Sequence, residues 1–151
     1  MTTLMKSPRV MKKAQEEIRN VFGEKDFIEE NDIQKLPYLK AVIKETMRMY
    51  TPLPLLVHRE TIKKCSIEGY EIPEKTLVYV NAWVVHRDLE TWKKPEEFYP
   101  ERFLDNKIDF RGYDFELIPF GVGRRICPGL CLLIFSILLV GKCLKGWKGK
   151  T

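Results

Sequence analysis

A short segment near the C-terminal end of the chain concentrates residue types that suit a thiolate metal ligand. Residues 120–129 read Phe-Gly-Val-Gly-Arg-Arg-Ile-Cys-Pro-Gly, so a single cysteine, Cys127, lies among three glycines and two arginines. Nearby cations and backbone N–H groups favour the deprotonated thiol that metals bind. Glycines let the backbone approach a flat cofactor, and the guanidinium of Arg125 suits a carboxylate. The segment predicts a metal–thiolate site, and the alternative is a loop around a buried, inert cysteine.

Two charged motifs precede this segment. Glu45 and Arg48 stand three residues apart on an expected helix, and Arg102 lies between Glu101 and Phe103. Taken alone, Glu45 and Arg48 would form a solvated ion pair that contributes about 0.2–0.5 kcal/mol. The order of all three motifs along one chain instead favours a common site.

In this order the motifs resemble those of the cytochrome P450 haem-thiolate monooxygenases, most closely the microsomal enzymes of plants. The resemblance runs from about residue 1 to 129. Three family patterns carry it: Glu-x-x-Arg at Glu45 and Arg48, Pro-Glu-Arg-Phe at 100–103, and Phe-x-x-Gly-x-Arg-x-Cys-x-Gly at Phe120, Gly123, Arg125, Cys127 and Gly129.

The resemblance implies a role for each matched residue. Cys127 would be the axial iron ligand of haem b, and its electron donation would favour O–O cleavage. No further catalytic residue is implied within the chain. The remaining assignments are cofactor-binding roles for Arg59, Phe120, Gly123, Arg125 and Gly129, a buried structural charge triad of Glu45, Arg48 and Arg102, and a substrate-facing apolar segment of Leu55, Leu56 and Val57. For Arg59, which would pair with a haem propionate as Arg125 does, the alternative is a solvated strand residue.

The implied activity is insertion of one oxygen atom into a small apolar molecule. Electrons would come from NADPH through a flavoprotein reductase. Apart from the resemblance, the positive charge of Arg124 next to the Cys127 loop favours docking of a reductase with an acidic surface on this side. The family's location is the cytosolic face of the endoplasmic reticulum membrane. The family's membrane anchor and oxygen-activating helix have no counterpart here, so the alternative is a truncated, catalytically silent haem-binding or non-functional fragment.

Hydrophobic periodicity predicts the elements that would position these residues. The expected fold is mainly α with a small antiparallel β-sheet, the C-terminal portion of the cytochrome P450 fold. Residues 1–129 would form the haem-ligand portion, and 130–151 a divergent basic tail. The expected elements are helices over 8–22 and from 37 to about 50, strands within 55–60, 65–68, 70–72 and 76–80, one helical turn at 82–86, and an ordered aromatic segment over 88–129.

Composition excludes several other classes of protein. With 151 residues, 44% of them hydrophobic and 31% charged, the chain fits one soluble globular domain. Most of the net charge of +5 comes from residues 130–151, which hold four lysines and no acid, so a nucleic-acid-binding face is not expected. The apolar run 130–140 is shorter than the roughly 20 residues that cross a bilayer, and no signal peptide is expected. The four cysteines form no Cys-x-x-Cys pair, which argues against structural zinc.

Overall fold

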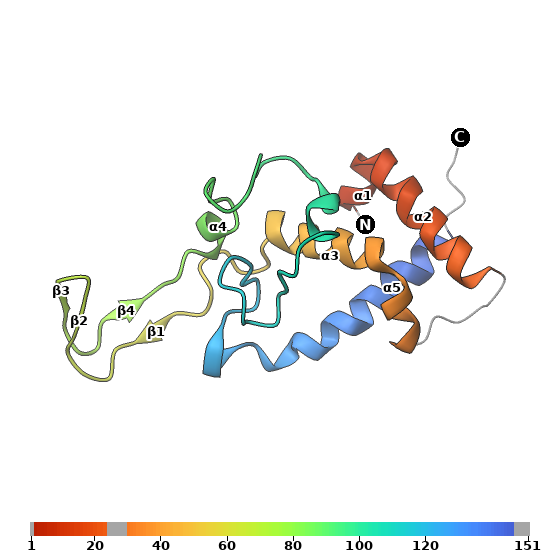
Figure 1. Cartoon of the computed structure of the whole chain (residues 1–151). Coiled ribbons are helices and arrows are strands. Elements are labelled where there is room, and N and C mark those ends of the chain that lie inside the picture. Colours follow the sequence, from red (N-terminus) through yellow and green to blue (C-terminus); the bar gives the residue numbers. More distant parts are fainter. Residues whose placement is uncertain (1, 24–29, 147–151) are drawn as a thin grey trace.

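The computed structural model describes residues 2–23 and 30–146, without the side chains of 30, 31, 130–136 and 138. The molecule has a helical body and a long arm that projects from it (Figure 1). The body contains helices α1 (Thr2–Lys6), α2 (Pro8–Phe22), α3 (Pro37–Met49) and α5 (Leu132–Gly146). Among the described residues, no helix is long and apolar enough to cross a bilayer.

Helix α2 has the bounds that the sequence predicts. Pro8 occupies its first turn, where a missing N–H leaves no bond unmade. Val10, Ala14 and Ile18 are buried on one face. At the C-terminal end, Gly23 takes φ +48° and its N–H donates to Arg19 O, a conformation that glycine adopts without steric cost.

A carboxylate from α2 caps the start of α3. The residue that precedes α3, Leu36, makes no side-chain cap. Instead, Glu17 accepts the backbone N–H groups of Tyr38 and Leu39, each at 2.8 Å. The negative charge also complements the positive end of the helix dipole. The contact therefore caps α3 and fixes it against α2.

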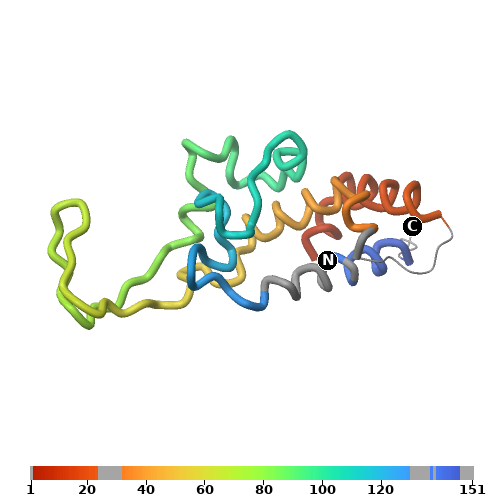
Figure 2. Tube along the Cα trace, turned by 60° about the horizontal axis from the view of Figure 1, so that its bottom comes forward, coloured from red at the N-terminus to blue at the C-terminus, as the bar shows by residue number. Residues whose placement is uncertain are grey.

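Helices α2, α3 and α5 enclose the main hydrophobic core, with α5 lying along both of the others (Figures 1 and 2). Ile18, Leu39 and Leu144 are fully buried there, one from each helix. A short 3-10 helix, η1 (Glu30–Lys35), contacts α3 and α5. The sequence predicted neither η1 nor α1.

The arm consists of two separate antiparallel pairs, where the sequence predicts one small sheet. Strand β1 (Arg59–Glu60) pairs with β4 (Leu77–Val78), and β2 (Cys65–Ile67) pairs with β3 (Tyr70–Ile72) at the tip. Strand β3 matches its expected segment, and the other three strands lie within their expected segments but are shorter. The expected strand over 55–60 is wrong in its first part: residues 55–57 form a turn and bend before β1, and Leu56 takes φ +51°.

The chain between the arm and α5 is ordered but has little regular structure, as the sequence predicts. It contains α4 (Ala82–Val85), capped by the side chain of Asn81, and the 3-10 helices η2 (Pro100–Phe103), η3 (Gly123–Arg125) and η4 (Pro128–Cys131). A second core, formed by Ala41, Trp92, Phe103 and Leu117, holds this segment against α3. The mainly helical fold with a small antiparallel component is therefore confirmed.

The start of α2 is also tied to η2. Glu101 accepts hydrogen bonds from Arg9 at 2.6 Å, from Lys13 at 3.3 Å and from the Tyr38 hydroxyl at 3.1 Å. Burial by itself raises the pKa of Glu101, but the bonds from Arg9, its own backbone N–H and Lys13 outweigh it and lower that pKa to about 2.

Candidate functional site

The structure brings Glu45, Arg48 and Arg102 together between α3 and η2. The side chains of Glu45 and Arg48 are fully buried, and that of Arg102 is 10% exposed. Arg48 binds Glu45 through two bonds, Nε to Oε2 at 2.8 Å and Nη2 to Oε1 at 2.9 Å. Arg102 Nε and the backbone N–H of Tyr99 donate to the same Oε1, at 3.2 and 2.9 Å. One carboxylate on α3 thus joins its own helix to the segment around η2.

Both guanidinium groups use their remaining N–H donors on backbone carbonyls. Arg102 donates to Lys93 O at 2.8 Å and to Lys94 O at 3.3 Å. Arg48 donates to His86 O at 2.7 Å. Buried charges are tolerated when every donor and acceptor is paired in this way. The cluster therefore organises the irregular chain over 86–102, which lacks a regular hydrogen-bond ladder of its own.

The loop that carries Cys127 is closed by a short backbone bond. The N–H of Cys127 donates to Phe120 O at 3.0 Å, and that of Ile126 donates to Gly123 O at 3.1 Å. Gly121 and Gly123 take φ +79° and +70°, values that residues with a Cβ rarely adopt. The sequence predicted that glycines would give this backbone its freedom, and the positive φ values of Gly121 and Gly123 agree.

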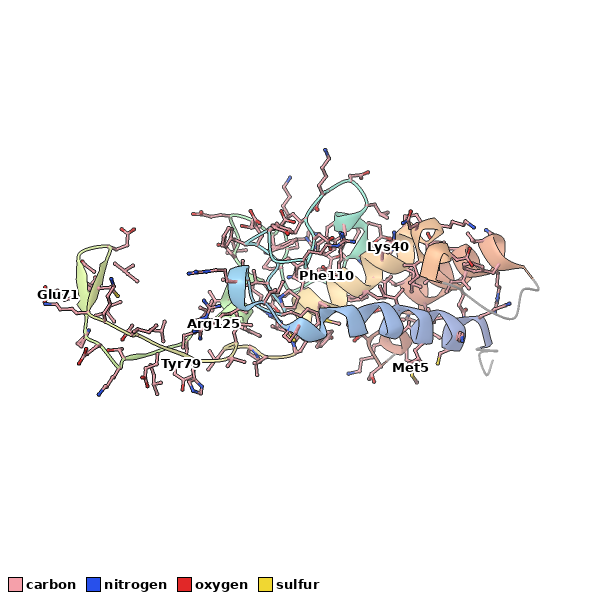
Figure 3. The ribbon with its side chains drawn as sticks, turned by 90° about the horizontal axis from the view of Figure 1, so that it is seen from below. Met5, Lys40, Glu71, Tyr79, Phe110 and Arg125 are labelled. Carbon is pink, nitrogen blue, oxygen red and sulfur yellow. The ribbon has the colours of Figure 1, made fainter. Side chains whose placement is uncertain are left out.

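The loop presents its polar groups to the outside. Cys127, Arg124 and Arg125 are all exposed, and a Cβ built at Gly123 would meet no atom within 4 Å. In Figure 3, Arg125 lies near the base of the arm, far from Glu71 at the tip. An exposed thiol argues against the alternative of a buried, inert cysteine.

The other expected cofactor and substrate residues are spread around this loop. Phe120 is half-buried and packs against the main core, and Gly129 lies in η4. Arg59 is exposed in β1 and faces Val78 across the strand pair.

The segment expected to face the substrate lies on the surface of the molecule. Leu55 and Val57 are exposed, and Leu56 is half-buried. The structure has a cavity of about 550 Å³ beside Trp92 and Arg102, and residues 55–57 do not line it.

Gly112 supports the cysteine loop, although the sequence analysis did not single it out. Its φ is +82°, and a Cβ there would lie 2.6 Å from Ile126 Cδ1 and 3.5 Å from Val122 Cα. The loop therefore packs directly on the backbone of this glycine. No sequence motif surrounds Gly112, so only the fold reveals the contact.

His86 is a second residue whose importance the sequence did not show. Its ring is fully buried, with Nδ1 2.7 Å from Thr51 Oγ1 and Nε2 accepting the backbone N–H of Ile118 at 2.9 Å.

The donor set limits what kind of metal centre the described residues could hold. Among the side chains that the structure describes, no group of three or more His, Cys, Asp or Glu could hold a metal ion. A single exposed thiol beside cationic side chains suits a metal that brings its other ligands with it, as a porphyrin does.

Comparison of the sequence with known proteins identifies its family and relatives. The family model described as Cytochrome P450 matches residues 1–138, which extends past the expected boundary at 129 into α5. The chain is 55% identical to "Cytochrome P450 71B3" of Arabidopsis thaliana, 52% identical to "Cytochrome P450 71D10" of Glycine max and 52% identical to "Tabersonine 16-hydroxylase 1" of Catharanthus roseus. Each match covers 92% of this chain and 28%, 27% and 28% of the respective relative.

Solved structures show the same relationship in three dimensions. A zebra fish cytochrome P450 with abiraterone matches with a TM-score of 0.83 and 33% identity, over 95% of this chain and 33% of that one. A zebra fish cytochrome P450 structure with progesterone gives the same score and identity. In each comparison the chain spans about a third or less of the protein it matches.

Proposed function

This chain belongs to the cytochrome P450 family, and we propose that it supplies the thiolate side of the haem site of a monooxygenase. One observation carries the proposal: Cys127 lies exposed in a loop closed by the Phe120–Cys127 backbone bond, with Arg125 beside it. Because the chain spans 27–28% of its plant relatives, the activity is proposed for a full-length protein that contains it.

The residues present fit haem b. Cys127 would bind the iron, and the open space next to Gly123 leaves room for a flat group to approach the loop. Arg125, and Arg59 from the arm, would pair with the propionates, since guanidinium forks suit carboxylates. Phe120 and Gly129 would border the group. When bound, haem supplies the activation of oxygen for the reaction.

The chain's own residues orient the cofactor. The charge triad of Glu45, Arg48 and Arg102 holds the segment over 86–102 against α3. His86, at the start of that segment, accepts the backbone N–H of Ile118, just before the cysteine loop. Rigid support matters because a ligand that moves by about 1 Å loses much of its preorganisation.

The proposal extends to the substrate, the source of electrons and the cellular location. We propose a small apolar substrate, bordered in part by Leu55, Leu56 and Val57, and electrons from NADPH through a flavoprotein reductase that docks near Arg124. The proposed location is the cytosolic face of the endoplasmic reticulum membrane. These proposals follow from the family and from the exposed positions of Arg124, Leu55 and Val57.

Substitution of single cysteines in the full-length protein tests the proposal. The purified protein is loaded with haem, reduced and exposed to carbon monoxide, and the Soret band is recorded. We expect a red-shifted, thiolate-type band that Cys127→Ser abolishes. Cys65→Ser, an exposed cysteine of β2, is the matched control and leaves the band unchanged. A band that survives Cys127→Ser contradicts the assignment of the ligand.

A further inference from the structure

His86 lies between the buried charge cluster and the chain that enters the cysteine loop. Its backbone O accepts Arg48 Nη1 at 2.7 Å, and its ring contacts Thr51 and Ile118. The ring is fully buried, and both of its nitrogens have a partner. A buried imidazole with two specific partners is held in one orientation.

The hydrogen bonds define the tautomer of the ring. Ile118 donates its backbone N–H to Nε2, so Nε2 carries no proton in the neutral imidazole. The proton is therefore on Nδ1, which donates to Thr51 Oγ1, while the Thr51 hydroxyl donates to Arg48 O at 3.2 Å. Burial, and then the positive charges of Arg48 and Arg87, lower the pKa of His86 to about 4. The ring is thus neutral at neutral pH and accepts the Ile118 bond.

A chain of backbone bonds continues from Ile118 to the ligand. Ile118 O accepts the N–H of Gly121 at 3.0 Å, which forms the turn into the loop, and Phe120 O accepts the N–H of Cys127 at 3.0 Å. Ile118 is itself almost fully buried. A shift of Ile118 therefore also moves the carbonyl of Phe120, which accepts the hydrogen bond from the N–H of Cys127.

We propose that His86 is a positioning residue for the haem ligand: by accepting the Ile118 N–H, it fixes the entry of the loop and hence the direction in which Cys127 presents its sulfur. The inference rests on the proposed haem function and adds a residue to it. A purely structural role would lower the stability of the fold without changing how the folded protein holds the iron.

Four substitutions in the full-length protein separate the two bonds of the ring. His86→Leu removes both. His86→Gln places an amide oxygen near the position of Nε2 and keeps an acceptor for Ile118, whereas His86→Asn reaches only the position of Nδ1. Thr51→Val removes the partner of Nδ1, together with the bond from Thr51 Oγ1 to Arg48 O, and leaves the Nε2 bond in place. His58→Gln is the control, because His58 is an exposed histidine that packs against Tyr79.

The measurements are the fraction of reduced, carbon monoxide-treated protein with the thiolate-type Soret band, and the rate at which the folded protein releases haem to an acceptor protein. For His86→Leu and His86→Asn we expect haem release to rise roughly 10-fold, the low end for partners that support a metal ligand, together with loss of the thiolate band. For His86→Gln we expect a thiolate band and a rate of haem release close to those of the unsubstituted protein, and for His58→Gln no change in either.

The outcomes distinguish this inference from the function on which it rests. If the unsubstituted protein shows no thiolate band, the proposed function fails. If that band is normal and His86→Leu leaves the band and haem release unchanged, only the role of His86 is overturned. If His86→Leu does not fold, His86→Gln is compared with His86→Asn instead. Equal thiolate-band fractions and equal rates of haem release in these two variants overturn the inference.

Discussion

The carboxylate of Glu45 is the shared counter-ion of two arginines. It has no exposure to solvent, and it neutralises Arg48 and Arg102 while also accepting the backbone N–H of Tyr99. The attraction between such groups is strong in a medium of low polarity, but it only balances the cost of removing them from water. Removal of one partner therefore lowers the free energy of unfolding by far more than the intact pair contributes to it.

We expect Glu45→Gln to lower the free energy of unfolding by about 3–5 kcal/mol, since it leaves a buried guanidinium without its counter-ion. Urea unfolding followed by circular dichroism measures the loss. The control is Glu71→Gln in the exposed pair of Glu71 with Lys64, where the change stays within about 1 kcal/mol. Equal losses for the two variants would show that the cluster is solvated.

The buried ring of His86 predicts a dependence of stability on pH. Its pKa is lowered to about 4 in the folded protein, from 6.5 in the unfolded chain. Between these values the unfolded chain binds the extra proton and the folded protein does not. The free energy of unfolding therefore falls as the pH drops from 6.5 toward 4, by up to about 1.4 kcal/mol per unit from this group.

Urea unfolding at pH 6.5, 5.5 and 4.5 measures this dependence in the unsubstituted protein and in His86→Gln. We expect a smaller slope in His86→Gln, because the amide does not titrate. Parallel slopes for the two proteins would indicate that the ring of His86 is open to water in the folded state.

Residue types predicted the glycine turns of the cysteine loop but not the residues that support the loop. Cys127, Arg125 and the glycines lie close together in sequence, so their chemistry can be read directly. Gly112 and His86 act through partners such as Ile126 and Ile118, which the fold alone brings to them. The contacts of these two residues do not follow from their neighbours in the sequence.

At the scale of elements, the contact between α2 and α3 depends on a side chain that acts across the helix pair. Glu17 satisfies two N–H groups at the start of α3 that otherwise lack partners within the helix. Helix α3, which carries Glu45 and Arg48, is thus held at its first turn by a side chain of α2.

We expect Glu17→Ala to cost about 1–2 kcal/mol of stability, because it removes a charged cap and leaves part-buried donors unpaired. The neighbouring Glu16 is the control: it is exposed, and it lies 3.9 Å from Lys12 in an ordinary surface pair. Glu16→Ala should change stability by no more than about 0.5 kcal/mol. Hydrogen exchange at the Tyr38 and Leu39 amides should accelerate only in Glu17→Ala, and unchanged exchange there would exclude the cap.

Helices were easier to predict than strands. Pro8 and Pro37, each followed by apolar residues at helical spacing, marked the starts of α2 and α3. The strands are only two or three residues long, and both faces of the arm are mostly exposed, so alternation of apolar residues carried little information about their ends. The apolar residues 55–57 followed a strand-like pattern, but the positive φ of Leu56 breaks the extended backbone.

At the scale of the whole molecule, the body and the arm differ in how they bury apolar surface. The body has two cores, whereas the arm exposes large apolar side chains along its length, including Val57 at 73%, Ile62 at 90% and Tyr70 at 77%. Each strand pair also has two open edges (Figure 1). Isolated two-stranded hairpins are marginal in water, and open apolar edges associate with other chains. The described residues provide no cover for this surface.

We therefore expect the 151-residue chain, expressed alone, to self-associate through the arm. Analytical ultracentrifugation should show oligomers, and anilinonaphthalene sulfonate should bind with strong fluorescence, because the dye reports exposed apolar surface. Val57→Lys and Ile62→Lys together should reduce both signals without changing helix content, since these side chains contact neither core. The matched control replaces Tyr113 and Phe115, exposed aromatic residues of the body, with lysine. If the control pair abolishes association and the arm pair does not, the contact surface is on the body, and the arm is stable in water despite its open edges.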